Sequence, residues 1–216
     1  MGGHIHFGAD FLGSDYKAWE NFYTIYNECE EIFYKMSNAA GQIPREKVSQ
    51  YAQTSNNKIL EMFETGEVNI RTQEDFEQVI KVMQDTRSRG VNVSNLGTIG
   101  KNTIEFRISN GTINPKVIRE NIKLFGSLLQ VSKKMSLNSE YRREEFERLK
   151  QKDLTEKEKT EALLDVLFDD EQEKSVYRER WDAVKDEKSF EKLKAKKPTF
   201  ERGNYSMKEQ TSGMLR

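Results

Sequence analysis

The sequence predicts an α+β fold in which a few antiparallel strands are backed by helices and followed by a helical extension. Three observations lead to this prediction. Residues 1–8 and 102–109 alternate apolar and polar side chains, as half-buried strands do. Several longer segments repeat apolar residues every three or four positions, as amphipathic helices do. After residue 138 the helical signals continue in a charge-rich sequence, which indicates an extension of the main body.

The first predicted strand carries the only two histidines of the chain. His4 and His6 are two positions apart, so they share one face of the strand, while Ile5 and Phe7 share the other. Side chains spaced in this way lie close enough to converge on one ion or one phosphate. A frayed terminus with two incidental imidazoles would explain the same pattern, so both interpretations stay open.

Helices are predicted for most of the next 80 residues. Ser14 or Asp15 caps a helix that runs to about residue 40. Its buried face is aromatic and apolar, with Trp19, Phe22, Tyr23, Tyr26, Phe33 and Met36. Two short helical pieces follow within residues 44–65, and Thr72 caps an amphipathic helix over residues 73–86.

An antiparallel hairpin is predicted from residues 91–96 and 103–109, joined by a loop with two glycines. On its second strand the apolar face holds Ile104, Phe106 and Ile108, and the polar face holds Thr103, Glu105, Arg107 and Ser109. Asn92 and Asn95 fall on opposite faces of the first strand, so only one of them can point toward Glu105. Taken alone, Glu105 and Arg107 also fit a plain exposed ion pair.

The end of this hairpin leads directly into a helix. Asn114 followed by Pro115 gives a helix cap with proline at the first helical position. The helix over residues 115–135 is expected to bury Val117, Ile118, Ile122, Phe125, Leu128 and Leu129. A strand that continues into a packed helix has a fixed end, which a positioned glutamate and arginine would need.

The remaining chain divides by composition. A charge-rich helix is expected over residues 138–152, a capping box at Thr155 opens the next helix, and Asp169 or Asp170 caps a third. The sequence from residue 188 is lysine-rich and then polar, which predicts a flexible tail. The expected units are therefore residues 1–137, 138–187 and 188–216.

Composition excludes some classes of protein. The 216 residues carry a formal net charge of −1, so no general positive field attracts nucleic acid. No stretch reaches the roughly 20 apolar residues that span a bilayer, and no basic region precedes an apolar run at the N-terminus. We therefore expect no nucleic-acid or membrane partner and a cytoplasmic location. The single cysteine, Cys29, excludes an internal disulfide and is expected to be buried.

Two motifs together resemble a known family. Gly-Gly-His-Ile-His-Phe-Gly at residues 2–8 and Thr-Ile-Glu-Phe-Arg-Ile-Ser-Asn-Gly-Thr-Ile-Asn-Pro at residues 103–115 are similar to the amidoligases, relatives of glutamine synthetase and glutamate-cysteine ligase. The resemblance implies an antiparallel sheet fragment of a glutamine synthetase-like catalytic fold. The implied activity is an ATP- and metal-dependent carboxylate-amine ligase that forms an amide through an acyl phosphate.

The resemblance also implies roles for four residues. His4 and Glu105 would bind a metal, Mg²⁺ or Mn²⁺; Arg107 would hold the transferring phosphate of ATP; and His6 would contact phosphate or the substrate carboxylate. The expected partners are small-molecule or peptide carboxylates and amines, with a homo-oligomer left open. In these ligases a Glu-x-Glu strand precedes the histidine motif, so the resemblance implies the C-terminal part of such a ligase, incomplete at its N-terminus.

Two other functions stay open from the sequence. One is a non-catalytic helical interaction module that retains a ligase-like remnant. The other is a metal-dependent hydrolase that uses the histidines as zinc ligands. The hydrolase ranks third because the sequence shows no third ligand or general base at a recognisable spacing.

Overall fold

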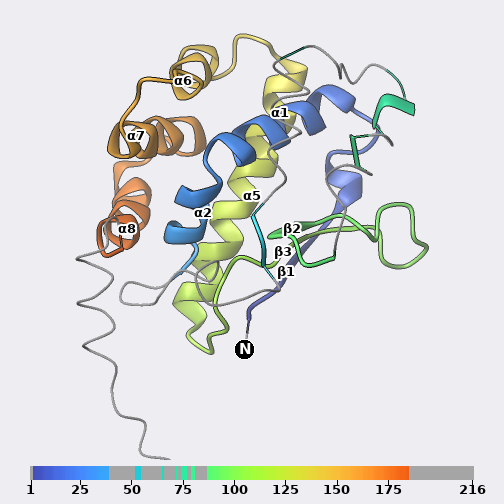
Figure 1. Ribbon diagram of the computed structural model, residues 1–216, viewed down its shortest axis with the longest axis horizontal. Helices are drawn as coiled ribbons and strands as arrows, with labels where there is room; N and C mark the ends of the chain where they lie inside the picture. Colours follow the sequence, from blue (N-terminus) through green and yellow to red (C-terminus); the bar gives the residue numbers. More distant parts are fainter. Residues whose placement is uncertain are drawn as a thin grey trace, which may run out of the picture.

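The computed structural model describes residues 2–38, 52–54, 65, 72, 74–76, 79–80 and 87–184. Figure 1 shows a small sheet on one side, α1 and α5 beside it, and the C-terminal helices beyond them. The elements are β1 (Ile5–Gly8), the 3-10 helix η1 (Ala9–Phe11), α1 (Tyr16–Glu28), α2 (Glu30–Met36), β2 (Val91–Asn92), β3 (Thr103–Phe106), α5 (Pro115–Leu137), α6 (Arg143–Leu149), α7 (Glu156–Leu167) and α8 (Glu171–Asp182). This mixture of helices and antiparallel strands confirms the predicted α+β class.

The sheet has the strand order β1-β3-β2, with both pairings antiparallel. The predicted hairpin is therefore present, but its strands are shorter than expected. β2 ends at Asn92 because the chain turns there, with the Leu96 amide bonded to the Val93 carbonyl at 3.0 Å. β3 ends at Phe106, and the Arg107 amide donates to the Gly90 carbonyl at 2.7 Å.

The apolar face of the sheet packs on α1 and α5. Phe106 of β3 stacks on Phe125 of α5 with ring centroids 4.3 Å apart, and its ring meets Phe22 of α1 edge to face at 6.1 Å. Phe7 of β1 completes this cluster at 5.8 Å from Phe106. The alternation predicted for β1 and β3 therefore turns these rings inward and leaves the opposite face of the sheet for polar side chains.

α1 begins at the predicted cap and is tied to α5. The Asp15 carboxylate accepts a hydrogen bond from the Ala18 amide at 3.2 Å. It accepts two more from α5, from Lys133 Nζ at 2.9 Å and from the Ser136 hydroxyl at 2.6 Å. Burial alone would raise the pKa of Asp15, but these three partners outweigh it and lower the pKa below its ordinary value. Asp15, rather than Ser14, is therefore the cap.

The prediction of one continuous helix from residue 15 to about residue 40 is wrong, because the structure has two helices there, α1 and α2. The helical segment divides at Cys29, whose amide bonds to the Tyr26 carbonyl three residues back, so the regular four-residue spacing is interrupted before α2 starts. Cys29 is buried, as predicted, and burial raises the pKa of its thiol. α2 then ends at Met36.

Two predictions about α5 and the strand before it are also wrong. Ile118 and Ile122 were expected in the core, but they are 39% and 46% exposed. Ser109 was expected on the polar face with Glu105, but it is buried, and its hydroxyl accepts from Asn121 of α5 at 3.2 Å. Ile108 is still buried, so the alternation is lost only at Ser109, where the chain bends.

The predicted caps of the C-terminal helices are confirmed. Thr155 and Glu158 form the capping box of α7, and Asp170 accepts from two amides of α8. α6 is shorter than the helix predicted over residues 138–152, because Asn138 caps α5 and Arg142 takes a left-handed conformation with φ of 57° just before α6.

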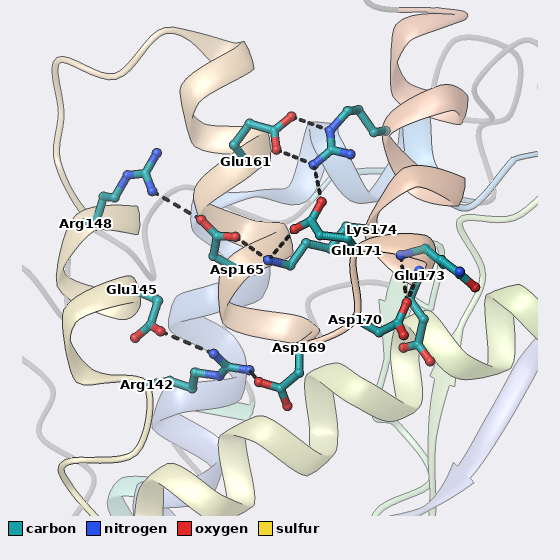
Figure 2. Close-up of polar contacts among 12 residues, drawn as sticks. Arg142, Glu145, Arg148, Glu161, Asp165, Asp169, Asp170, Glu171, Glu173 and Lys174 are labelled. Atoms are coloured by element: carbon teal, nitrogen blue, oxygen red, sulfur yellow. Dashed lines mark hydrogen bonds and ion pairs between the residues drawn. The ribbon is translucent and has the colours of Figure 1, made fainter.

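Ion pairs join α6, α7 and α8 (Figure 2). Asp165 of α7 receives Arg148 at 3.2 Å and Lys174 at 2.6 Å, so one carboxylate links three helices. Arg178 of α8 binds both carboxylate oxygens of Glu161 at 2.7 Å. These pairs match opposite charges between the helices, while the apolar side chains of α7, such as Leu163 and Leu164, are buried in the core.

The C-terminal helices share the core of the preceding part. Arg180 of α8 is buried and donates to the Met36 carbonyl at 3.0 Å and to Asn121 Oδ1 at 2.7 Å, and it pairs with Glu120. Tyr177 of α8 donates to the Glu120 carbonyl at 2.8 Å. α8 is therefore fixed to both α2 and α5.

Some predictions fall on residues outside those described. The helical pieces within residues 44–65, most of residues 73–86 and the tail from residue 188 belong to this group. The cap at Thr72 is confirmed, because Thr72 and Asp75 exchange side-chain to amide hydrogen bonds of 3.0 and 3.1 Å. None of the helices in the described part of the chain has the length and apolar character needed to cross a membrane.

Candidate metal centre

The polar face of the sheet brings the two histidines to one glutamate. β3 is the central strand, and its register pairs Glu105 with His6 on β1 and with Asn92 on β2. His4 lies two positions before His6, on the same face. Residues from the start of the chain and from the middle therefore meet because β1 and β3 are neighbours.

The three side chains converge on one oxygen. His4 Nδ1 lies 2.8 Å from Glu105 Oε1, and His6 Nε2 lies 3.6 Å from the same oxygen. The Glu105 side chain is 8% exposed, whereas those of His4 and His6 are 36% and 46% exposed. The carboxylate thus lies at the bottom of the site and the imidazoles form a rim open to solvent.

This arrangement fits a divalent cation. One ligand atom from each of the three residues lies within 4.8 Å of the others. Two ligands at about 2.1 Å from one ion lie about 3 to 3.5 Å apart, and the two observed separations from Glu105 Oε1, 2.8 and 3.6 Å, bracket that range. Two imidazoles with one carboxylate suit Mn²⁺ or Zn²⁺ better than Mg²⁺, which prefers oxygen ligands.

Asn92 fixes the orientation of the carboxylate. Its Nδ2 donates to Glu105 Oε2 at 2.7 Å, and its Oδ1 accepts from the Ser94 amide at 3.0 Å. Glu105 Oε2 is therefore held by β2 while Oε1 faces the imidazoles. The sequence left open whether Asn92 or Asn95 points toward Glu105, and the structure identifies Asn92.

Thr103 contacts the second nitrogen of one imidazole. Its Oγ1 lies 3.4 Å from His6 Nδ1, so the other ring nitrogen, Nε2, is the one that faces Glu105. Metal-binding histidines commonly have such a partner on the nitrogen that does not bind the ion. Sequence reasoning assigned Thr103 no role, although its place on the polar face two residues from Glu105 was a usable signal.

Arg107 lies beside the carboxylate. Its Nε is 3.9 Å from Glu105 Oε1, and its Nη1 donates to the Arg87 carbonyl. The side chain is 15% exposed, so its positive charge acts in a partly desolvated place where it offsets the charge of Glu105. The expected role of Arg107 in holding a phosphate remains a prediction.

The structure thus brings together all four residues expected in the site. No family model, no curated protein and no solved structure matches the chain. The site itself offers three convergent donor atoms, a carboxylate held by Asn92, an adjacent guanidinium and a rim open to solvent.

Proposed function

We propose that the chain is an ATP- and metal-dependent carboxylate-amine ligase of the amidoligase type, with a glutamine synthetase-like catalytic fold, acting in the cytoplasm. The observation that carries the proposal is the convergence of His4, His6 and Glu105 beside Arg107. A cation-binding cluster next to a fixed guanidinium is the combination that phosphoryl transfer needs.

The proposed reaction has two steps. A carboxylate oxygen of the substrate attacks the terminal phosphorus of ATP, forming a carbon-oxygen-phosphorus bridge, while the bond to the ADP oxygen breaks. An amine nitrogen then attacks the carbonyl carbon, the carbon-nitrogen bond forms, phosphate leaves and the nitrogen loses a proton. Both steps develop negative charge on oxygen atoms, so the protein must supply positive charge at fixed positions.

The residues of the site would bind the ion and stabilise the negative charge. His4, His6 and Glu105 would hold Mn²⁺ or Mg²⁺, and the bound ion supplies positive charge to the phosphate oxygens. Arg107 adds a second positive group beside Glu105. His6, on the exposed rim, would contact a phosphate or a substrate carboxylate when its Nε2 does not bind the ion.

Metal binding and turnover test this proposal separately. Isothermal titration with MnCl₂ should show one ion per chain, and Glu105→Gln should weaken binding by at least about tenfold, because it removes the charged ligand. Glu144→Gln, at an exposed position on α6, is the matched control and should bind the ion like the unsubstituted chain. Equal binding by both variants would refute the metal centre.

Turnover is measured as phosphate released from ATP with Mn²⁺ and a panel of amino acids and simple amines. Release should require both a carboxylate and an amine, and Arg107→Met should abolish it while Mn²⁺ binding is retained or strengthened, because a positive charge beside Glu105 is removed. If the ion binds and ATP turnover is absent with every pair, the metal centre stands and this chain on its own is not a ligase. A chain with neither property fits the interaction module.

One observation favours a second candidate, a zinc-dependent hydrolase. Two histidines and one glutamate, with an open side for water, form a ligand set found in catalytic zinc sites. Glu105 would supply the third ligand, although its distance from the histidines in the sequence matches no recognisable zinc-site spacing. This function predicts stoichiometric zinc in the purified chain and ester or peptide hydrolysis without ATP, and removal of zinc by a chelator should stop that hydrolysis.

A further inference from the structure

A cavity of about 550 Å³ lies apart from the metal centre, at the end of β1 remote from His4. It forms where η1, the first turns of α1 and the loop before β3 meet. Its volume is in the range of small-molecule sites. Its apolar wall is formed by Tyr16, Trp19, Phe76, Ile80 and Leu96.

The aromatic part of the wall is held in place before any ligand arrives. Trp19 Nε1 donates to the Gly13 carbonyl at 2.8 Å, which fixes the indole. The Phe76 ring packs on Trp19 at 5.0 Å and on Tyr16 at 5.6 Å between centroids. Preset rings bind an apolar body at little entropic cost, and their faces also attract positive charge.

A carboxylate lies at the polar side of the cavity. Asn102 Nδ2 donates to Asp10 Oδ1 at 2.7 Å, and Asn102 Oδ1 accepts from the Gly97 amide at 3.0 Å. The Asn102 amide is thus engaged at both ends, and it orients Asp10. Among the described residues that line the cavity, Asp10 is the one with a formal charge.

We propose that this cavity binds an organic ammonium ion with an apolar or aromatic body. The ammonium group pairs with Asp10, and the body rests on the wall of Trp19 and Phe76. A carboxylate favours a cation over a neutral group of the same shape, and the apolar wall favours a ligand with a hydrophobic body over a bare cation. This cavity is separate from the metal centre, and binding of an amine there does not require the function proposed for that centre.

Phenethylamine and its neutral isostere 2-phenylethanol test the proposal by isothermal titration of the whole chain. The amine should bind at least about fivefold more tightly than the alcohol, and added salt should reduce that preference. Asp10→Asn keeps the oxygen that accepts from Asn102 but removes the charge, so the two ligands should then bind equally. Asp153→Asn, at an exposed position outside the cavity, should keep the full preference.

A second variant tests the place of binding. Ile80→Trp fills part of the cavity and should weaken both ligands at least about fivefold, with circular dichroism confirming that the variant is folded. The comparison of the two ligands uses the unsubstituted chain, so it stands even if a variant fails to fold. Equal affinity for amine and alcohol, absence of amine binding at millimolar concentration, or a folded Ile80→Trp variant that binds like the parent would each overturn the proposal.

Discussion

Replacement of Arg180 by methionine should be among the most destabilising substitutions in the C-terminal helices. Arg180 is 4% exposed, and its guanidinium donates hydrogen bonds to the Met36 carbonyl, to Asn121 Oδ1 and to the Glu120 carboxylate. Methionine keeps most of the aliphatic packing but leaves these three acceptors without their donor. Breaking a buried charge pair costs about 3 to 5 kcal/mol.

The expected loss lies at the lower end of that range. The Glu120 side chain is 17% exposed, so water partly replaces the lost guanidinium, and Lys116 remains 3.9 Å from its carboxylate. We therefore expect a loss of about 3 kcal/mol in the free energy of unfolding, which corresponds to about 6 to 12 °C in Tm for a chain of this size.

Arg178→Met is the matched control on the same helix. Arg178 makes a two-pronged pair with Glu161, but both side chains are about one-third exposed, and such pairs contribute about 1 kcal/mol or less. Urea unfolding followed by circular dichroism gives both values from the transition midpoint and slope. The reasoning fails if Arg180→Met costs no more than Arg178→Met.

Three further predictions concern other parts of the molecule. Gly90→Ala would place a Cβ 2.5 Å from Tyr34 Oη, so it should lower the free energy of unfolding, measured in urea, by about 1 to 3 kcal/mol. Gly8→Ala has open space at its Cβ and should lower it much less, and equal losses would contradict this account. Asn92→Ala should weaken Mn²⁺ binding about 10- to 100-fold in calorimetric titration, because Glu105 loses its orienting partner, and unchanged affinity would show that the amide is dispensable. Because its partners lower the pKa of Asp15 on folding, its carboxylate stabilises the fold above the ordinary aspartate pKa, and this stabilisation disappears as pH falls through the folded-state pKa. Asp15→Asn should therefore lose stability in thermal unfolding at pH 7, and this loss should shrink as the pH falls below the ordinary aspartate pKa; a loss independent of pH would contradict the assignment.

Local features of the fold could be predicted from the sequence. A cap depends on a few neighbouring residues, so the sequence alone identifies Asp15, Thr155 and Asp170 as caps or cap candidates. Alternation likewise places His4 and His6 on one face and Glu105 on a polar face. These patterns need no knowledge of which segments become neighbours.

Features that depend on distant contacts were missed or left open. The register that sets His6 opposite Glu105 arises from the packing of β1 against β3, across about a hundred residues of sequence. The exposure of Ile118 and Ile122 has the same origin, because helical spacing marks an apolar stripe without showing how far the neighbouring elements cover it. The choice of Asn92 over Asn95 was open because the sequence did not show that β2 stops at Asn92.

The strands that carry the ligands of the metal centre differ in how many neighbouring strands hold them. Glu105 belongs to a strand flanked on both sides, whereas His6 lies on β1 and His4 lies just before it, and β1 pairs with β3 alone among the described residues. An ion bound by His4, His6 and Glu105 would therefore crosslink β1 to β3. Ion binding should therefore slow amide hydrogen exchange in β1 far more than in β3. Conversely, a change that loosens β1 should weaken binding of the ion.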